Sequence, residues 1–289
     1  MYKTDRSCII GVFVIPGQKD HPFRPGEESS FEKAVDFALR ASFNDFNFRT
    51  LKKITGKQIP PDCKGNPQTI TDYLVDHLKS CGFQKQFALY FNTAAPDAHA
   101  FDDWHNKTCC LFLDALTGTG LYEKILYGKA QKIVNMMFKH LYCLSGAEAY
   151  EAHFRHCHVT LDNFTLEWFK RYIPPYKRIE SWSNLVYKDP FSDPSDYLFY
   201  QHHIRIFFQT AEGKKQYASL TPFQAEFYIW REIQLRLAAE AFTFELQPDD
   251  YKGNSSFAQV RKKEIRALSV EKLIATVETA ITDYKAKSQ

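Results

Sequence analysis

Residues 129–144, KAQKIVNMMFKHLYCL, carry the clearest helical pattern in the chain and decide the expected fold class. Apolar side chains recur three and four residues apart, a spacing that places them on one face of a helix. They stand at Ala130, Ile133, Val134, Met137, Leu141 and Leu144. Lys132, Asn135 and Lys139 fall on the other face. The pattern therefore predicts a helix that packs its apolar face against the core.

Comparable patterns on both sides of this stretch predict further helices. Ser29 and Glu32 form a capping-box pattern that opens one helix, and another begins at Thr69 and ends at Gly82. Helices are also predicted at 107–116, 121–127, 161–172 and 222–241, and from Ser269 onward. Residues 197–208 fit a helix or a strand equally well.

One segment near the N-terminus suggests extended structure. Residues 9–15 are apolar and end at Pro16 and Gly17, as a short buried strand would. The chain has no internal repeat and no clear linker. We therefore expect a mainly α, compact multi-helix protein with a central helix-hairpin-helix and few short strands. Residues 1–289 would form one helical domain or two closely packed lobes.

The composition narrows the class of protein. Hydrophobic residues make up 44% and aromatic residues 16% of the 289 residues, which excludes a disordered chain. The net charge of +3 permits nucleic-acid binding without requiring it. No stretch reaches 18 apolar residues, so we expect no membrane span. The sequence does not define the oligomeric state, and a monomer is the expectation.

The seven cysteines give no metal or redox motif, because none of them form a CxxC pair. Several, such as Cys109 and Cys143, lie in apolar surroundings. Buried free thiols fit a reducing compartment, and we expect a cytoplasmic protein.

One segment suggests a binding site. Residues 125–135, ILYGKAQKIVN, read as the end of one helix, a glycine turn and the start of another. The first N–H groups of a helix lack partners within the helix, and together with its dipole they favour a phosphate. Predicted phosphate contacts are the side chain of Lys124 and the segment Gly128, Lys129, Ala130 and Gln131.

The same segment resembles the helix-hairpin-helix DNA glycosylases, particularly their 8-oxoguanine branch. An apolar pair, a glycine, Lys132 and small apolar residues stand in the order found in that family's hairpin. Downstream, 159–162 reads apolar-x-apolar-Asp, and the aromatic residues Phe164 and Trp168 follow Asp162, as in the family. The resemblance covers only this part of the chain. It implies a catalytic pair of Lys132 and Asp162, damaged duplex DNA as the partner and no cofactor.

The chemistry of the two residue types fits that activity. An uncharged lysine amine can attack the anomeric carbon of a nucleotide and form a Schiff base. The carboxylate of Asp162 would then orient the amine and stabilise positive charge on the sugar. The expected reaction is removal of an oxidised purine, with or without strand cleavage as an AP lyase. A flipped-out base would need an aromatic pocket.

Two other functions remain open. His153, His156 and His158 could hold the metal of a hydrolase, although no HExxH pattern completes such a site. A helical module that binds nucleic acid or protein without catalysis is the non-enzymatic alternative. In that case Lys132 would be an exposed helix lysine, and Asp162 an N-terminal helix cap.

Overall fold

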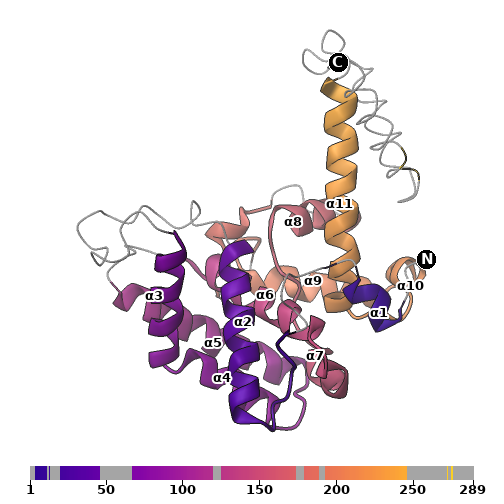
Figure 1. Ribbon diagram of the computed structural model, residues 1–289. Coiled ribbons are helices and arrows are strands. Elements are labelled where there is room, and N and C mark those ends of the chain that lie inside the picture. The colour runs from indigo at the N-terminus through magenta and orange to yellow at the C-terminus, as the bar shows by residue number, and fades with distance from the viewer. Residues whose placement is uncertain are drawn as a thin grey trace, which may run out of the picture. The chain divides into compact units, whose positions relative to one another are not determined.

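The computed structural model describes residues 4–11, 13, 20–45, 67–119, 125–173, 179–188 and 193–245, together with Lys272 and Ala275 (Figure 1). Backbone contacts divide the chain into two units, Met1–Phe227 and Tyr228–Gln289. The fold and the sites below belong to the first unit.

The predicted mainly α fold is confirmed. The α-helices are α1 (Arg6–Ile10), α2 (Glu28–Asp45), α3 (Pro67–Ser80), α4 (Phe83–Phe91), α5 (Ala98–Gly118), α6 (Tyr127–Cys143), α7 (Glu151–Phe154), α8 (Asn163–Tyr172), α9 (Tyr197–Gln209), α10 (Ala211–Tyr217) and α11 (Pro222–Glu245). Two 3-10 helices, η4 (Ala147–Tyr150) and η5 (Trp182–Asn184), connect some of them. The few short strands are not found among the described residues, where one isolated parallel bridge joins Val186 and Asp196.

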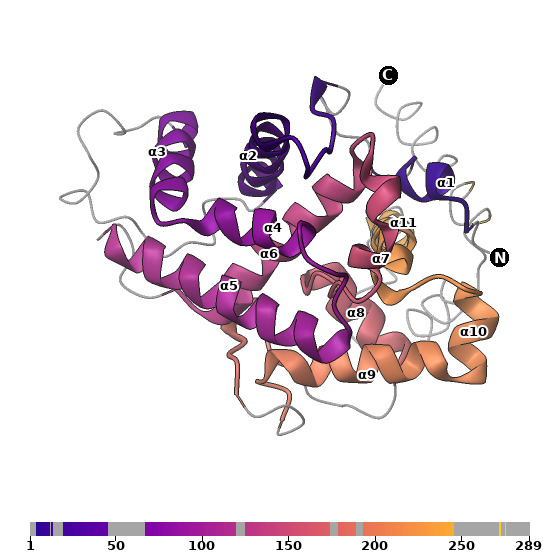
Figure 2. The ribbon, with the colours of Figure 1, turned by 90° about the horizontal axis from the view of Figure 1, so that it is seen from below.

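Helix α6 lies at the centre of this unit. It contacts α2, α5, η4 and η5. Figures 1 and 2 both show it beside α2 and α5. Lys132 is the one residue of α6 that is not buried. The expected polar face is therefore inside the protein, because Asn135 and Lys139 find buried polar partners in place of water.

Aromatic side chains fill much of the core around α6. Phe138 contacts Phe87, Tyr90 and Phe101 at ring-centroid distances of 5.4 to 5.6 Å. Tilted and edge-on contacts of this kind suit the ring quadrupole and add to the burial of apolar surface. The high aromatic content of the chain thus serves packing first.

The predicted strand at the N-terminus is wrong where the structure describes it. Ile9 and Ile10 belong to α1, which begins after Asp5. The Asp5 carboxylate accepts a hydrogen bond from the N–H of Ser7 at 2.8 Å and caps the helix. This cap and the burial of Ile9 outweigh the preference of β-branched residues for strands. Residues 12 and 14–19 lie outside the described part.

Several predicted helix boundaries shift by a few residues. Helix α2 begins at Glu28, so Ser29 lies inside it, and α5 extends well beyond 107–116 on its N-terminal side. Residues 197–208 form a helix, α9. Gly82 separates α3 from α4 with φ +78°, as its predicted role required. The helix predicted from Ser269 lies outside the described residues, except for helical Lys272 and Ala275.

Within the described residues, no helix combines the length and the apolar character that a membrane crossing needs.

Candidate functional site

Gly128 does not form the turn of a helix-hairpin-helix. Leu126 is extended, and α6 begins at Tyr127, so Gly128 lies in the first turn of the helix. A Cβ at this position would stand 1.8 Å from the carbonyl oxygen of Trp182, so the glycine allows η5 to approach α6. The N–H of Gly128 donates to Leu185 at 3.0 Å. The prediction that this N–H faces a phosphate is therefore wrong.

The neighbouring predicted phosphate contacts also face the protein. Ala130 and Gln131 are fully buried, and the N–H of Lys129 donates to the carbonyl oxygen of Leu126 at 2.9 Å. The main chain of this turn is thus directed to the protein's own acceptors. Lys124 lies outside the described residues. Any ligand at the start of α6 would have to bind side chains.

The side chains of Lys129 and Lys132 provide the charge here. Their ammonium groups lie 5.7 and 5.0 Å from the centre of the Trp182 indole ring. Two cations over one aromatic ring gain cation–π attraction and repel each other. Burial and then the charge of Lys132 lower the pKa of Lys129.

Asp162 lies at the start of α8 as its N-cap. Its Oδ1 accepts hydrogen bonds from the N–H groups of Phe164 and Thr165 at 2.9 and 3.0 Å. The Thr165 hydroxyl in turn accepts from the N–H of Asp162 at 2.8 Å, which completes a capping box. The predicted position of Asp162 at the opening of a helix is confirmed. The carboxylate is held in one orientation by these bonds.

A pair of hydrogen bonds joins the segments that carry Lys132 and Asp162. The Gln131 amide donates to the carbonyl oxygen of Leu161 at 2.8 Å and accepts from its N–H at 3.2 Å. Lys132 follows Gln131, and Asp162 follows Leu161. Lys132 makes no ion pair with a described carboxylate.

The three histidines of 153–158 do not converge. The Nε2 atom of His153 lies 2.9 Å from the carbonyl oxygen of Thr93, whereas both ring nitrogens of buried His158 bond to other side chains. His156 lines a separate cavity. Over the described ranges, no three His, Cys, Asp or Glu residues are placed to hold a metal ion.

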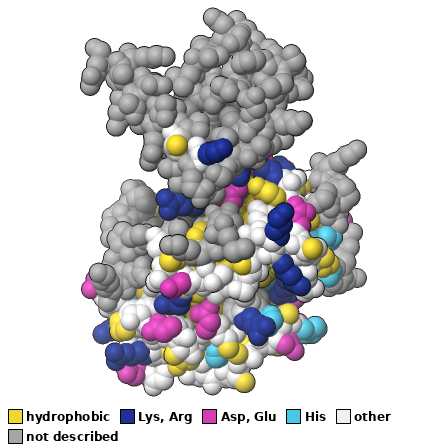
Figure 3. Space-filling view, turned by 90° about the vertical axis from the view of Figure 1, so that its right-hand side faces the viewer, with side chains coloured by type: hydrophobic (Ala, Val, Ile, Leu, Met, Phe, Trp, Pro, Cys, Tyr) yellow, Lys and Arg dark blue, Asp and Glu magenta, His cyan; other side chains and the backbone are white. Residues whose placement is uncertain are grey.

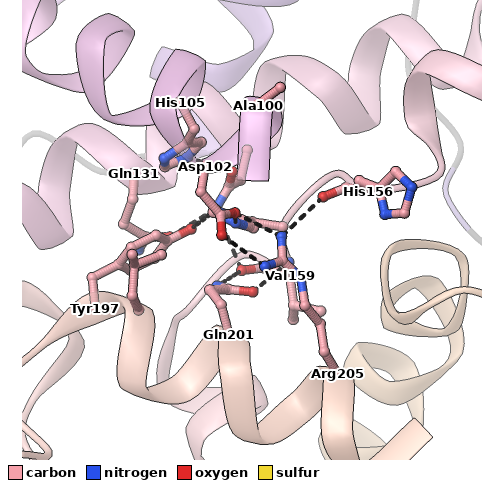
Figure 4. Close-up of polar contacts among 12 residues, drawn as sticks. Ala100, Asp102, His105, Gln131, His156, Val159, Tyr197, Gln201 and Arg205 are labelled. Carbon is pink, nitrogen blue, oxygen red and sulfur yellow. Dashed lines mark hydrogen bonds and ion pairs between the residues drawn. The ribbon is translucent and has the colours of Figure 1, made fainter. Parts of the chain in front are cut away.

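His158 belongs to a buried chain of hydrogen bonds, of which Figure 4 labels His105, Tyr197 and Asp102. The chain runs through Tyr127, His105, Asn135, Tyr197, His158 and Asp102, in that order, at successive distances of 3.1, 2.9, 2.9, 2.9 and 2.6 Å. The Asn135 amide donates to the Tyr197 hydroxyl, which leaves the hydroxyl hydrogen for Nδ1 of His158. Nε2–H of His158 then donates to the carboxylate of Asp102. Every donor in the chain thus points toward Asp102.

Asp102 also forms an ion pair with a cation on α9. Arg205 donates to both of its oxygens at 2.8 and 2.7 Å, a bidentate pair visible in Figure 4. Burial opposes ionisation of Asp102, but the hydrogen bonds from His158 and Arg205 outweigh it and hold its pKa far below the usual range. Burial, with the charge of Arg205, lowers the pKa of His158 to about 4. At neutral pH the centre is a carboxylate, a guanidinium and a neutral imidazole.

Sequence reasoning missed this centre. Asp102 and Arg205 are 103 positions apart, on α5 and α9, and neither belongs to a local motif. The one available signal was the density of histidines at 153–158, which pointed to a metal instead.

The described residues define a mainly α-helical protein with a lysine pair at the start of its central helix and a directed polar network behind it. Comparison of the chain with protein-family models, with curated proteins and with solved structures finds no match.

Proposed function

We propose that the chain is a DNA glycosylase that removes an oxidised purine through the amine of Lys132, with Asp162 as the assisting carboxylate. The observation that carries the proposal is the double hydrogen bond between Gln131 and Leu161. These bonds hold Gln131, which precedes Lys132, close to Leu161, which precedes Asp162. The partner would be damaged duplex DNA, and the reaction needs no cofactor.

The setting of Lys132 supports a role at the surface of the central helix. Because the other residues of α6 are buried, Lys132 is the position at which a ligand can reach this helix. Its ammonium group lies over Trp182 and beside Lys129. The amine has to be in its uncharged form to act as a nucleophile.

The hydrogen bonds of Asp162 hold its carboxylate in a fixed orientation, as the proposed role requires. Hydrogen bonds from two backbone N–H groups orient it. A carboxylate so held can stabilise positive charge that develops on a sugar without first having to reorganise.

The reaction balances with these two groups. The uncharged amine attacks the anomeric carbon, and the bond to the base breaks. The base leaves with that electron pair and takes up a proton, while the amine nitrogen gives a proton to the carboxylate. Asp162 gives this proton to the ring oxygen as the sugar ring opens to the Schiff base, and water hydrolyses the Schiff base to restore the amine. Strand cleavage would follow only if a proton is removed from the opened sugar before hydrolysis.

The surface charge indicates how DNA would be held. In Figure 3, Lys and Arg side chains are interspersed with acidic and apolar side chains on the face shown and do not form one basic stripe. If duplex DNA binds to this face, we expect few phosphate contacts and a shallow dependence of affinity on salt.

Base release under single-turnover conditions tests the proposal. The wild-type chain should free 8-oxoguanine from a duplex oligonucleotide, and both Lys132→Gln and Asp162→Asn should lower the rate at least a hundredfold. Lys33→Gln removes an exposed lysine of α2 and should leave the rate unchanged. Failure to release any of a panel of damaged bases would contradict the proposal.

Binding without catalysis is the second candidate function. It is favoured by the capping bonds of Asp162, which account for that residue without chemistry. In this case the chain would retain duplex DNA and release no base, and Asp162→Asn would leave affinity unchanged.

A further inference from the structure

A second site lies on the other side of Asp102 from the buried histidine network. It is a cavity of about 240 Å³ where the start of α5, residues 155–157, α9 and the start of α11 meet. Its lining is Ala98, Arg155, His156, Cys157, Gln201, Arg205, Phe208, Gln209, Thr221 and Pro222. The lining includes two arginines and a histidine, and it contains no carboxylate.

Two side chains of this lining, Arg155 and His156, can donate hydrogen bonds to a ligand. Arg155 is exposed, and neither its guanidinium nor the His156 ring makes a hydrogen bond or ion pair with another described residue. The cavity therefore presents donors that have no partner within the described part of the protein.

The carboxylate of Asp102 holds the Arg205 side chain in place. Its bidentate pair with Asp102 fixes the guanidinium plane, and the same carboxylate accepts from buried His158. A guanidinium fixed in this way keeps its charge and loses little further entropy when a ligand binds. The amide of Gln201 bonds to Val159 on both of its atoms and so forms a rigid wall.

We propose that this cavity binds a doubly charged tetrahedral oxyanion, either inorganic phosphate or the phosphate group of a small monoester. Arg155, His156 and Arg205 would surround it, and the planar guanidinium of Arg155 suits paired phosphate oxygens. The volume accommodates a phosphate group with a small substituent. The proposal is independent of the DNA glycosylase function and of Lys132.

The charges around His156 make binding depend on pH. Burial, then Arg205 and Arg155, lower the pKa of His156. Asp97 and Asp102 act in the opposite direction and raise it. A bound dianion would add to that effect and raise the His156 pKa further. Binding should therefore be accompanied by proton uptake at His156 and should be tighter at pH 6 than at pH 8.

Titration calorimetry on the full chain tests the proposal. Sulfate is the first probe, because it keeps two charges over this pH range, and inorganic phosphate and phenyl phosphate follow. Wild-type protein should bind sulfate, and Arg155→Gln and His156→Gln should each weaken binding about tenfold. Lys33→Gln removes the same charge from α2, which contributes nothing to the cavity, and should leave affinity unchanged.

Other probes separate the sources of the anion. Phenyl phosphate should bind as well as inorganic phosphate if the ligand is a monoester, and worse if the site takes the free ion. Dimethyl phosphate carries one charge and should bind far more weakly than either. No sulfate binding at millimolar concentration, or equal weakening by Lys33→Gln, would overturn the proposal. Equal binding at pH 6 and pH 8 would exclude His156 from it.

Discussion

Gln131 on α6 hydrogen-bonds to both backbone polar groups of Leu161, the residue that precedes the N-cap of α8. The bonded Gln131 side chain is fully buried, so it cannot exchange these partners for water. The start of the central helix and the start of α8 are therefore fixed against each other. The residues that carry the proposed amine and carboxylate, Lys132 and Asp162, each directly follow one of the two bonded residues.

Substitution of Asp162 separates its structural role from its chemical one. Asp162→Ala removes the side chain that caps α8 and should lower the free energy of unfolding by about 1 kcal/mol. Asp162→Asn keeps an acceptor oxygen at the cap and should change stability by less than about half of that. Urea denaturation measures both values. A base-release rate that follows stability across the two variants would show that Asp162 acts only as a cap.

Gly128 should tolerate no side chain. A Cβ on Gly128 would stand 1.8 Å from the Trp182 carbonyl oxygen, and backbone cannot move aside as a flexible side chain can. Gly128→Ala should therefore destabilise the protein by about 3 kcal/mol or more. Gly26→Ala is the matched control, because no atom lies within 4 Å of its added Cβ. Equal midpoints for the two variants in thermal unfolding would contradict the packing of η5 on α6.

Replacing only one partner of the buried ion pair between Lys139 and Glu226 should strongly destabilise the protein. The two groups lie 2.9 Å apart, and their side chains are only 3% and 1% exposed. Lys139→Met leaves the carboxylate buried without its cation and should cost about 3–5 kcal/mol. Adding Glu226→Gln should recover much of the loss, because the amide oxygen can still accept from the N–H of Thr160. A double variant no more stable than Lys139→Met would refute this account of the pair.

The neutral state of His158 should make the protein sensitive to mild acid. Its pKa is about 4 when folded against 6.5 for an ordinary histidine, so the unfolded chain takes up a proton first as the pH falls. Stability from this group is complete above pH 6.5 and is lost between pH 6.5 and 4, by about 3 kcal/mol. His158→Gln should flatten that decline, whereas His99→Gln, at an exposed position, should not. Parallel pH profiles for wild type and His158→Gln would contradict the prediction.

The sequence predicted the helices well where one face is apolar, because that spacing is local. It failed at residues 9–15, where a cap on Asp5 outweighs β-branched side chains. It also misread Gly128, since a glycine required for close approach to Trp182 looks in sequence like a glycine in a turn. The second error comes from a contact with a distant segment, which a local pattern does not contain.

Only part of the candidate site could be predicted from the sequence. Position and spacing indicated that Asp162 opens a helix, and the structure confirms this. Asp102, Arg205 and the cavity beside them depend on how α5 and α9 pack, and no spacing rule connects two such distant positions. The spacing of the histidines suggested a shared metal for a similar reason. It does not show that His158 is buried while His156 lines a cavity.

Borohydride trapping is the most direct test of the central claim that Lys132 is a nucleophile. Purified protein would be incubated with duplex DNA containing 8-oxoguanine and then reduced, and the adduct mapped by peptide mass spectrometry. If Lys132 is the nucleophile, a covalent protein–DNA adduct forms on Lys132, is absent from Lys132→Gln and is retained in Lys129→Gln. An adduct on Lys129, or no adduct with any of several damaged bases while duplex DNA is still bound, would contradict it.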